Sequence, residues 1–170
     1  VPVVTDATPD SADGGAGNRR GLFVAASLAA LLALVLYAPT FLGGGHGFVN
    51  YDDPDLVSAA NPAIGQGFWS GMPTLADPSR TPQFMHAWLP LYYGSAAIDH
   101  HLGGGAPWVF HLHSAALHAF GAALVVLIGV RLRLPVVAAG IAGAAFAVHP
   151  AATENVAWVA GRKDVLSFAW

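Results

Sequence analysis

Two adjacent aspartates follow closely on the first apolar segment of the sequence, which ends at residue 42. They are Asp52 and Asp53, in the stretch Asn-Tyr-Asp-Asp-Pro-Asp at 50–55. If the segment lies in a membrane, these carboxylates stand close to its surface. A carboxylate there could accept a proton from an acceptor hydroxyl, or bind a divalent cation that bridges phosphate oxygens. Asp-Asp-Pro-Asp is also favourable turn chemistry, so a solvated turn is the alternative interpretation.

A second group of residues that could do chemistry lies further along the chain. His149 and Glu154 offer an acid and a base, and Arg162 and Lys163 add two cations in the same short stretch. Such cations could bind an anionic group at a membrane surface, such as a lipid phosphate. Ordinary headgroup contact for the cations, and a plain helix terminator for His149, remain open as alternatives.

Polar residues also interrupt the second long apolar segment. His111, Ser114 and His118 are spaced i, i+3 and i+7, so they share one face of a helix, while His113 points elsewhere. Polar residues inside a membrane span usually face the bundle interior and mark function. Contact with a substrate and a hydrogen-bonded structural role both remain possible for these histidines.

The sequence argues against several other classes of site and partner. It contains no cysteine, so disulfides and thiolate metal sites are excluded. The adjacent His100 and His101 would diverge on a helix, so they are a poor signal for a metal site. Asp52 and Asp53 are the candidates for any divalent cation, and no cofactor is indicated with certainty. A net charge of -3 and a pI near 6.2 lack the basic footprint of nucleic-acid binding, so nucleic acid is not an expected partner.

The elements that must position these residues are membrane helices. Only 10% of the residues are charged, against roughly 25% in soluble domains, and the mean hydropathy is +0.53. Every Asp, Glu, Lys and Arg lies outside the three strongest apolar runs, as the cost of burying charge in a bilayer requires. We predict spans at about 21–42, 108–130 and 134–148, with a fourth beginning at about 165. The first would be about 33 Å long, enough to cross a hydrocarbon core of about 30 Å.

Arginines indicate the orientation of these spans. An Arg pair at 19–20 ends a polar stretch, 1–20, that we expect to be a disordered cytoplasmic tail, and Arg131 and Arg133 follow the second span. Both sites agree with a cytoplasmic N-terminus, so the long loop 43–107 should lie outside. A secretory signal peptide is the competing interpretation of the first span, but the apolar run exceeds the usual 7 to 15 residues.

The external loops should carry short helices near the membrane surface. The first loop has prolines at 54, 62, 73, 78, 82 and 90, so it should be largely irregular. Its best helix is 87–102, where Trp88, Tyr92 and Tyr93 suit headgroup depth. The third span is rich in Ala and Gly, which favours close packing against other helices. After it, 151–160 should form an amphipathic helix.

Three stretches of the sequence resemble the N-terminal membrane region of a known family, the transmembrane and tetratricopeptide-repeat O-mannosyltransferases, its bacterial relatives included. They are Phe-Val-Asn-Tyr-Asp-Asp-Pro at 48–54, Trp-Leu-Pro-Leu at 88–91, and His-Pro-Ala-Ala-Thr-Glu-Asn-Val-Ala-Trp-Val-Ala-Gly-Arg-Lys-Asp-Val-Leu at 149–166. The third stretch is long and specific. The resemblance covers about 45–170, and we read the chain as the N-terminal fragment of a longer protein.

The resemblance implies an all-α polytopic membrane protein with a GT-C-like transmembrane helix bundle and a long first extracytoplasmic loop. Such an enzyme takes a sugar, typically mannose, from a polyprenyl-phosphate carrier and passes it to a protein hydroxyl on the extracytoplasmic side. The expected partners are therefore the lipid-linked donor, a protein acceptor and membrane lipid, in a bacterial plasma membrane. Tetratricopeptide repeats would follow beyond this fragment.

The resemblance also assigns roles to residues. Asp52 and Asp53 match the first-loop acidic motif that is associated with catalysis, and Arg162 and Lys163 become candidates to hold the carrier phosphate. Glu154 and His149 belong to the second-loop motif and are further candidates for donor binding. Three other residues are candidates for substrate contacts or structural roles: His111, His118 and Pro90.

The chain departs from the family pattern at three positions. Leu89 stands where relatives usually carry His or Arg, Ser114 where bacterial relatives tend to carry Asn, and Gly161 where many have Glu. A non-catalytic membrane anchor for the repeats is therefore an alternative function. A transporter in which the second-span histidines line a pathway is a third hypothesis.

Overall fold

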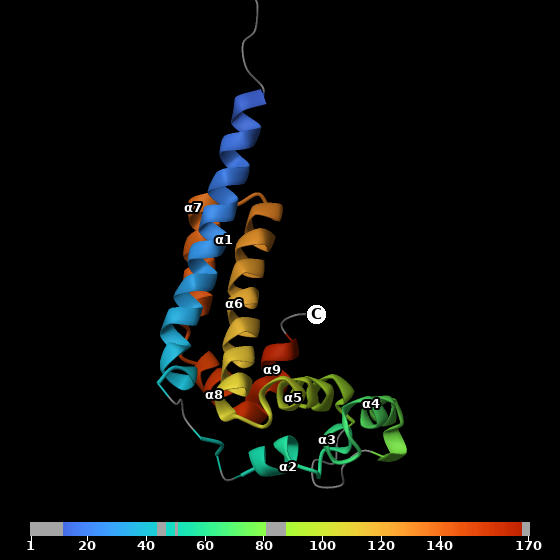
Figure 1. Ribbon diagram of the computed structural model, residues 1–170. Coiled ribbons are helices and arrows are strands. Elements are labelled where there is room, and N and C mark those ends of the chain that lie inside the picture. The colour runs from blue at the N-terminus through green and yellow to red at the C-terminus, as the bar shows by residue number, and fades with distance from the viewer. Residues whose placement is uncertain (1–11, 44–46, 50, 81–87, 168–170) are drawn as a thin grey trace, which may run out of the picture.

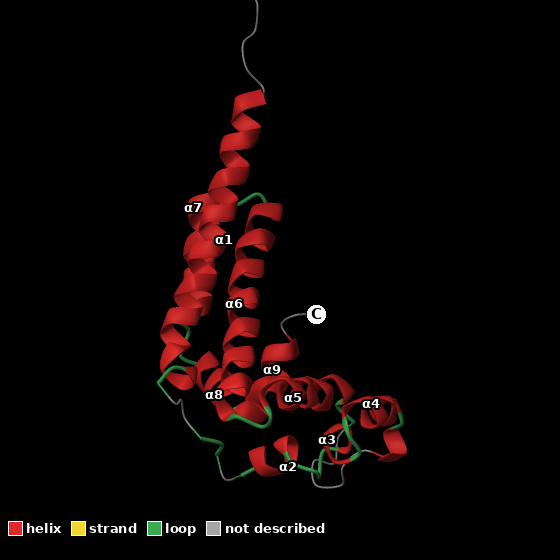
Figure 2. Ribbon diagram, viewed as in Figure 1, coloured by secondary structure: helices red, strands yellow, loops and turns green. Residues whose placement is uncertain are grey.

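The computed structural model describes residues 12–43, 47–49, 51–80 and 88–167. Within these ranges every regular element is a helix (Figure 2). Three long helices form a bundle, and the short helices gather around one end of it (Figure 1).

The bundle consists of α1 (Ala12–Phe41), α6 (Pro107–Arg131) and α7 (Val136–Ala147), which lie side by side. Two helices are long and apolar enough to cross a membrane, namely α6 and the Gly17–Phe41 part of α1. They agree with the spans predicted at 21–42 and 108–130.

Two helix boundaries differ from the prediction. The first helix already begins at Ala12, inside the predicted disordered tail, because extending an existing helix by further residues costs little once it has nucleated. Residues 1–11 of that tail lie outside the described part of the chain. The third helix has only 12 residues, about 18 Å, because Pro135 takes the N-cap position and helical structure ends at Ala147. That is shorter than the bilayer core that the predicted span 134–148 was expected to cross.

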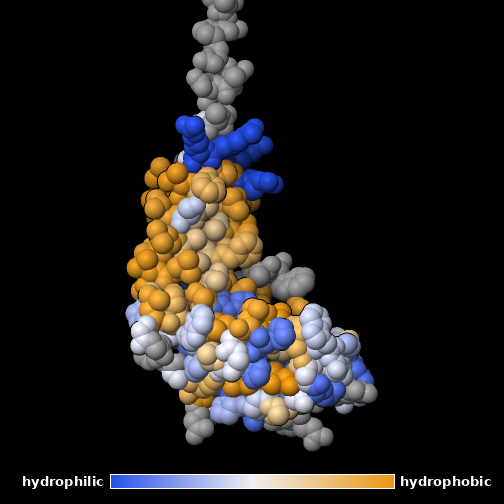
Figure 3. Space-filling view, in the orientation of Figure 1, coloured by the Kyte–Doolittle hydropathy of each residue, from blue (hydrophilic) through white to orange (hydrophobic). Residues whose placement is uncertain are grey.

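The bundle is held together by small side chains. Ala139, Gly143 and Ala147 recur every four residues on α7, so they form one stripe that is buried against α1 and α6. The other buried members of this cluster are also small or β-branched: Ala29, Ala33, Ala119, Ala122 and Val126. Large apolar side chains cover the outside of the bundle (Figure 3). This is the pattern expected where lipid surrounds the helices and close backbone approach holds them together.

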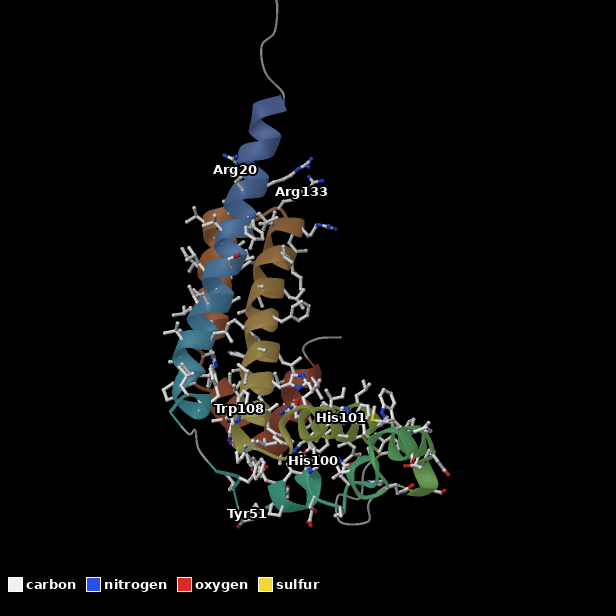
Figure 4. All side chains as sticks on the ribbon, in the orientation of Figure 1. Arg20, Tyr51, His100, His101, Trp108 and Arg133 are labelled. Atoms are coloured by element: carbon white, nitrogen blue, oxygen red, sulfur yellow. The ribbon has the colours of Figure 1, made fainter. Side chains whose placement is uncertain are left out.

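Basic residues gather at one end of the bundle. Arg20 at the start of the apolar part of α1 and Arg133 in the turn between α6 and α7 lie at the same end (Figures 3 and 4). The short helices and Tyr51 lie at the opposite end (Figure 4). The two charge signals that were used to orient the spans are thus on one side.

The first loop is built from short helices, as predicted. They are α2 (Asp53–Val57), α3 (Pro62–Gly65), α4 (Phe68–Gly71), η1 (Met72–Ala76), η2 (Pro78–Arg80) and α5 (Pro90–Gly103). A proline occupies the first turn of most of these elements, where its missing N–H is not needed. The prolines therefore divide the loop into helices instead of leaving it irregular.

The prediction that two tyrosines of α5 lie at headgroup depth is wrong. Tyr92 and Tyr93 are buried in a core that also contains Leu56, Ala96 and Phe110. This core packs α2 and α5 against the start of α6, and the tyrosine rings fill it. Their amphipathic character is suited both to a wet interface and to a protein interior, so the sequence could not distinguish the two.

The second loop differs in its details from the single helix predicted at 151–160. Helix α8 (Ala152–Ala157) ends where Trp158 adopts an extended conformation, and η3 (Val159–Gly161) leads directly into α9 (Arg162–Ser167). The rest of the predicted fourth span lies outside the described residues.

Replacement of Gly143 by Ala should destabilise the bundle. The added Cβ would lie 2.4 Å from Val126 Cγ2 and 3.0 Å from the Ala122 carbonyl oxygen, so the helices must separate. We expect a loss of about 1–3 kcal/mol in unfolding free energy, measured by thermal unfolding in detergent micelles. The control is Gly17→Ala on α1, where a Cβ has no neighbour within 4 Å and should be neutral or stabilising through helix propensity. Equal stability of the two variants would contradict the packing described here.

Candidate functional site

The carboxylate of Asp53 joins the first loop to the second. One oxygen, Oδ2, accepts a hydrogen bond from the Val49 N–H at 2.8 Å, and the other, Oδ1, accepts one from the Ala160 N–H at 2.8 Å. The side chain is fully buried at the first residue of α2. Each carboxylate oxygen therefore already has a protein partner.

Burial also changes the acidity of this group. It raises the pKa of the Asp53 carboxyl above its ordinary value of 3.8, against the smaller opposing effects of the two N–H donors and of nearby His111. The neighbouring charge of Asp52 acts in the same direction as burial.

Asp52 is the more accessible of the two aspartates. It is half-buried at the N-cap position of α2, and its side chain makes no capping hydrogen bond there. Its charge contributes to raising the pKa of Tyr92, whose principal cause is burial, so the carboxylate lies within electrostatic reach of that phenol. The structure brings Asp52, Tyr92 and Asp53 together at the same corner of the fold.

Arg162 is completely buried. A side chain that binds a phosphate directly would have to be accessible. Its Nη1 lies 2.5 Å from Asp99 Oδ2, its Nε donates to Ser114 Oγ at 3.1 Å, and its Nη2 donates to the Phe110 carbonyl at 2.6 Å. A further hydrogen bond reaches Ser95 Oγ at 3.3 Å. The guanidinium is thus bound by partners on α5 and α6.

Sequence reasoning missed the two other members of this network. Asp99 on α5 lies between Arg162 and His113, whose Nδ1 is 2.6 Å from Asp99 Oδ1. His113 was set aside because it points away from the other second-span histidines. The one available signal was an acidic residue in an otherwise apolar stretch of α5, which needs a buried counter-charge from another element.

Lys163, unlike Arg162, is exposed and lies on a cleft with a volume of about 230 Å³. Its Nζ also lies 6.0 Å from the centre of the Trp158 ring. The cleft runs between the start of α5 and α9, and its walls are mostly apolar. Its lining residues are Trp88, Leu89, Pro90, Leu91, Tyr92, Lys163, Leu166 and Ser167.

The remaining second-loop candidates are exposed. His149 Nδ1 accepts a hydrogen bond from the Ala151 N–H at 3.2 Å, so it shapes the turn before α8. Glu154 lies in the first turn of α8 with its side chain exposed. Both stand at the same end of the bundle as the cleft, on the loop that contains Ala160.

The second-span residues have mainly structural surroundings. His111, Ser114 and His118 are all buried, as their shared helix face predicted. His118 lies between the rings of Tyr37 and Phe146, and its Nε2 is 3.1 Å from the Ala147 carbonyl oxygen, so it links α6 to α7. Of the histidines on α6, His113 lines a cavity between α5 and α6, together with Asp99.

The described residues contain no group of three or more His, Asp or Glu side chains arranged to hold a metal ion. A divalent cation held by Asp52 and Asp53 stays a prediction.

Removal of the Arg162 guanidinium should strongly destabilise the fold. Arg162→Met leaves the buried Asp99 carboxylate without its cation, which typically costs about 3–5 kcal/mol. The double variant Arg162→Met/Asp99→Leu should recover most of this loss, since it removes both charges. Thermal unfolding in detergent micelles measures both effects. Lys163→Met is the matched control and should change little, because that cation is exposed. A double variant less stable than Arg162→Met would disprove the pairing.

The raised pKa of Asp53 predicts a pH dependence of stability. Since the folded state holds the proton more tightly than the unfolded state, the contribution of this group is full below pH 3.8 and is lost as the pH rises through the raised pKa. We therefore expect the wild type to lose stability relative to Asp53→Asn as the pH is raised from below 3.8 to neutral. The measurement is the difference in melting temperature between the two proteins at each pH. A difference that changes in the opposite direction would contradict the expected shift.

The sequence was compared with known proteins. No protein-family model matches the chain, and no solved structure matches it. It is 40% identical over 144 residues to Protein O-mannosyl-transferase Tmtc2 of Drosophila melanogaster, and 36% identical over 148 residues to Protein O-mannosyl-transferase Tmtc1 of the same organism. These alignments cover 79% and 80% of the chain but only 14% and 16% of the two relatives. Over most of its length, the chain is therefore similar to a small part of two protein O-mannosyl-transferases.

Proposed function

We propose that the full-length protein transfers mannose from a polyprenyl-phosphate carrier to a hydroxyl group of a protein acceptor. The names of the two relatives support mannosyl transfer to protein. The lipid-linked donor is our inference from the cleft that Lys163 borders.

The cleft between α5 and α9 is the single observation that carries this proposal. Its walls are largely apolar, and Lys163 supplies a cation beside them. A polyprenyl phosphate combines a hydrocarbon chain with an anionic group, so it matches both properties. A free nucleotide sugar would instead require polar partners for its base and ribose.

Asp52 is the best placed general base. Its carboxylate is half-exposed and makes no capping hydrogen bond, while both oxygens of Asp53 accept backbone N–H groups. Asp52 also interacts electrostatically with Tyr92, which lines the cleft. It can therefore approach an acceptor hydroxyl that enters beside the donor.

In the proposed reaction the acceptor hydroxyl gives its proton to the Asp52 carboxylate while its oxygen attacks the anomeric carbon of the sugar. The bond between that carbon and the phosphate oxygen breaks, and the electron pair leaves with the phosphate. Lys163 stabilises the charge that develops on this oxygen. Attack from the face opposite the phosphate inverts the anomeric configuration.

Within this proposal the other site residues have separate roles. Lys163 replaces Arg162 as the direct phosphate contact, because the Arg162 guanidinium is buried among protein partners. His149 and Glu154 are exposed on the second loop and are candidates for contacts with the sugar or the acceptor. Pro90 forms part of the cleft wall.

The arginines at the far end of the bundle support an orientation for this chemistry. By the positive-inside tendency, the end that carries Arg20 and Arg133 faces the cytoplasm. The cleft, at the end occupied by the loop helices, then opens on the extracytoplasmic side of the membrane.

A non-catalytic membrane anchor is the second candidate function, and one observation favours it. Leu89, which stands where the resembling family usually carries His or Arg, lines the cleft and leaves Lys163 as the only cation among its described lining residues. A cleft with fewer polar contacts could hold a lipid without promoting transfer.

Asp52→Asn should abolish transfer in the full-length protein while leaving it folded and inserted. Loss of a general base typically reduces the rate by about 10²–10⁴-fold. The assay measures transfer of mannose from polyprenyl-phosphate mannose to a protein acceptor in membranes. Asp55→Asn, which removes the same charge from the same helix, is the matched control and should keep wild-type activity. Wild-type turnover in Asp52→Asn would rule out the base, and a wild type without any transfer would favour the anchor.

A further inference from the structure

The backbone of Ala160 is held on both sides by residues of the first loop. Its N–H donates to Asp53 Oδ1 at 2.8 Å, and its carbonyl oxygen accepts a hydrogen bond from the Tyr92 hydroxyl at 3.0 Å. Both partners are distant in sequence, 107 and 68 residues away. All three residues are buried, so neither hydrogen bond competes with bulk water.

The residues that follow Ala160 are also fixed in position. A Cβ on Gly161 would lie 2.9 Å from Asn155 Cα and 3.2 Å from the Glu154 carbonyl oxygen, so the chain passes directly against α8. Arg162 is anchored on α5 and α6, and Lys163 comes next, at the cleft. Because only Gly161 and Arg162 separate Ala160 from Lys163, a displacement of the Ala160 backbone would change the path of the chain that leads to Lys163 at the cleft.

We propose that Asp53 and Tyr92 are positioning residues that hold the N–H and the carbonyl of Ala160. This clamp sets the position of Lys163 relative to Asp52. This inference rests on the proposed function and deepens it. Asp53 is suited to the role because it offers one oxygen to Val49 on its own loop and the other to Ala160. Tyr92 is suited because its hydroxyl must keep its proton to donate, and burial raises its pKa.

The clamp predicts a particular kinetic effect. Asp53→Asn retains one acceptor oxygen, so one of the two N–H groups loses its partner. Tyr92→Phe removes the hydroxyl alone and leaves the Ala160 carbonyl unpaired. Each change loosens the backbone of the same residue, Ala160, so each should weaken the contact of Lys163 with the donor phosphate without removing the base.

The experiment measures kcat and the donor KM for the full-length protein in membranes, with polyprenyl-phosphate mannose as donor. We expect Asp53→Asn and Tyr92→Phe each to raise the donor KM about tenfold, the effect of losing one hydrogen bond, with a much smaller change in kcat. The double variant should resemble the worse single variant, because both substitutions act on the backbone of one residue.

Matched controls separate the clamp from general damage. Asp55→Asn changes the same charge on α2, and Tyr51→Phe removes a hydroxyl from a tyrosine that is 79% exposed. Both should leave the donor KM unchanged. If Asp53→Asn does not fold, Tyr92→Phe alone decides the question, since it removes a single oxygen atom.

Two results would overturn the inference. One is an unchanged donor KM in Tyr92→Phe. The other is a loss of kcat in Asp53→Asn with an unchanged donor KM, which would make Asp53 the base. A wild-type kcat in Asp52→Asn would instead refute Asp52 as the base. The donor KM of Asp53→Asn and Tyr92→Phe would still decide whether the clamp exists.

Discussion

The buried guanidinium of Arg162 is the interaction on which the arrangement of the loop helices depends. A charge removed from water is tolerated only when it is paired and hydrogen-bonded, and Asp99 provides the opposite charge at 2.5 Å. The remaining guanidinium contacts are with oxygens on the two neighbouring helices: Ser95, Phe110 and Ser114. Because these partners belong to α5 and α6, α9 can satisfy Arg162 in only one position relative to both. The second loop is thereby fixed against the first.

In each of two pairs of like-charged neighbours, one residue is buried and the other is accessible. The pairs are Asp52–Asp53 and Arg162–Lys163. Asp53 and Arg162 are buried and bound to protein groups, while Asp52 is half-buried and Lys163 is exposed. Successive residues at the start of a helix project in different directions, so one member of a pair can be buried while its neighbour faces outward. The buried member of each pair connects elements of the fold, and the accessible member is the one that we propose to contact a ligand. In the proposed reaction, this division separates structural charges from reacting ones.

The helix bundle obeys a different rule from the loop region. Its charges lie at the ends, and small residues such as Ala139 and Gly143 bring the helices into contact. In lipid, apolar side chains gain little by leaving their surroundings, so close packing must hold the helices together. The loop region instead has a core of larger side chains, including Leu56, Tyr93 and Phe110, around its hydrogen-bonded polar groups. The cleft lies in this loop region, where the packed core holds the polar groups in fixed positions.

The sequence by itself determined the long apolar helices, the arginines that flank them, the loop helices and the shared face of His111 and His118. These features are local, because hydropathy, helix period and proline in the first turn act within a few residues. Only the tertiary structure decided which aspartate is accessible, that Tyr92 is buried, and that Asp99 is the partner of Arg162. Burial and charge pairing depend on residues that are tens of positions apart, and no local pattern specifies which of them will meet.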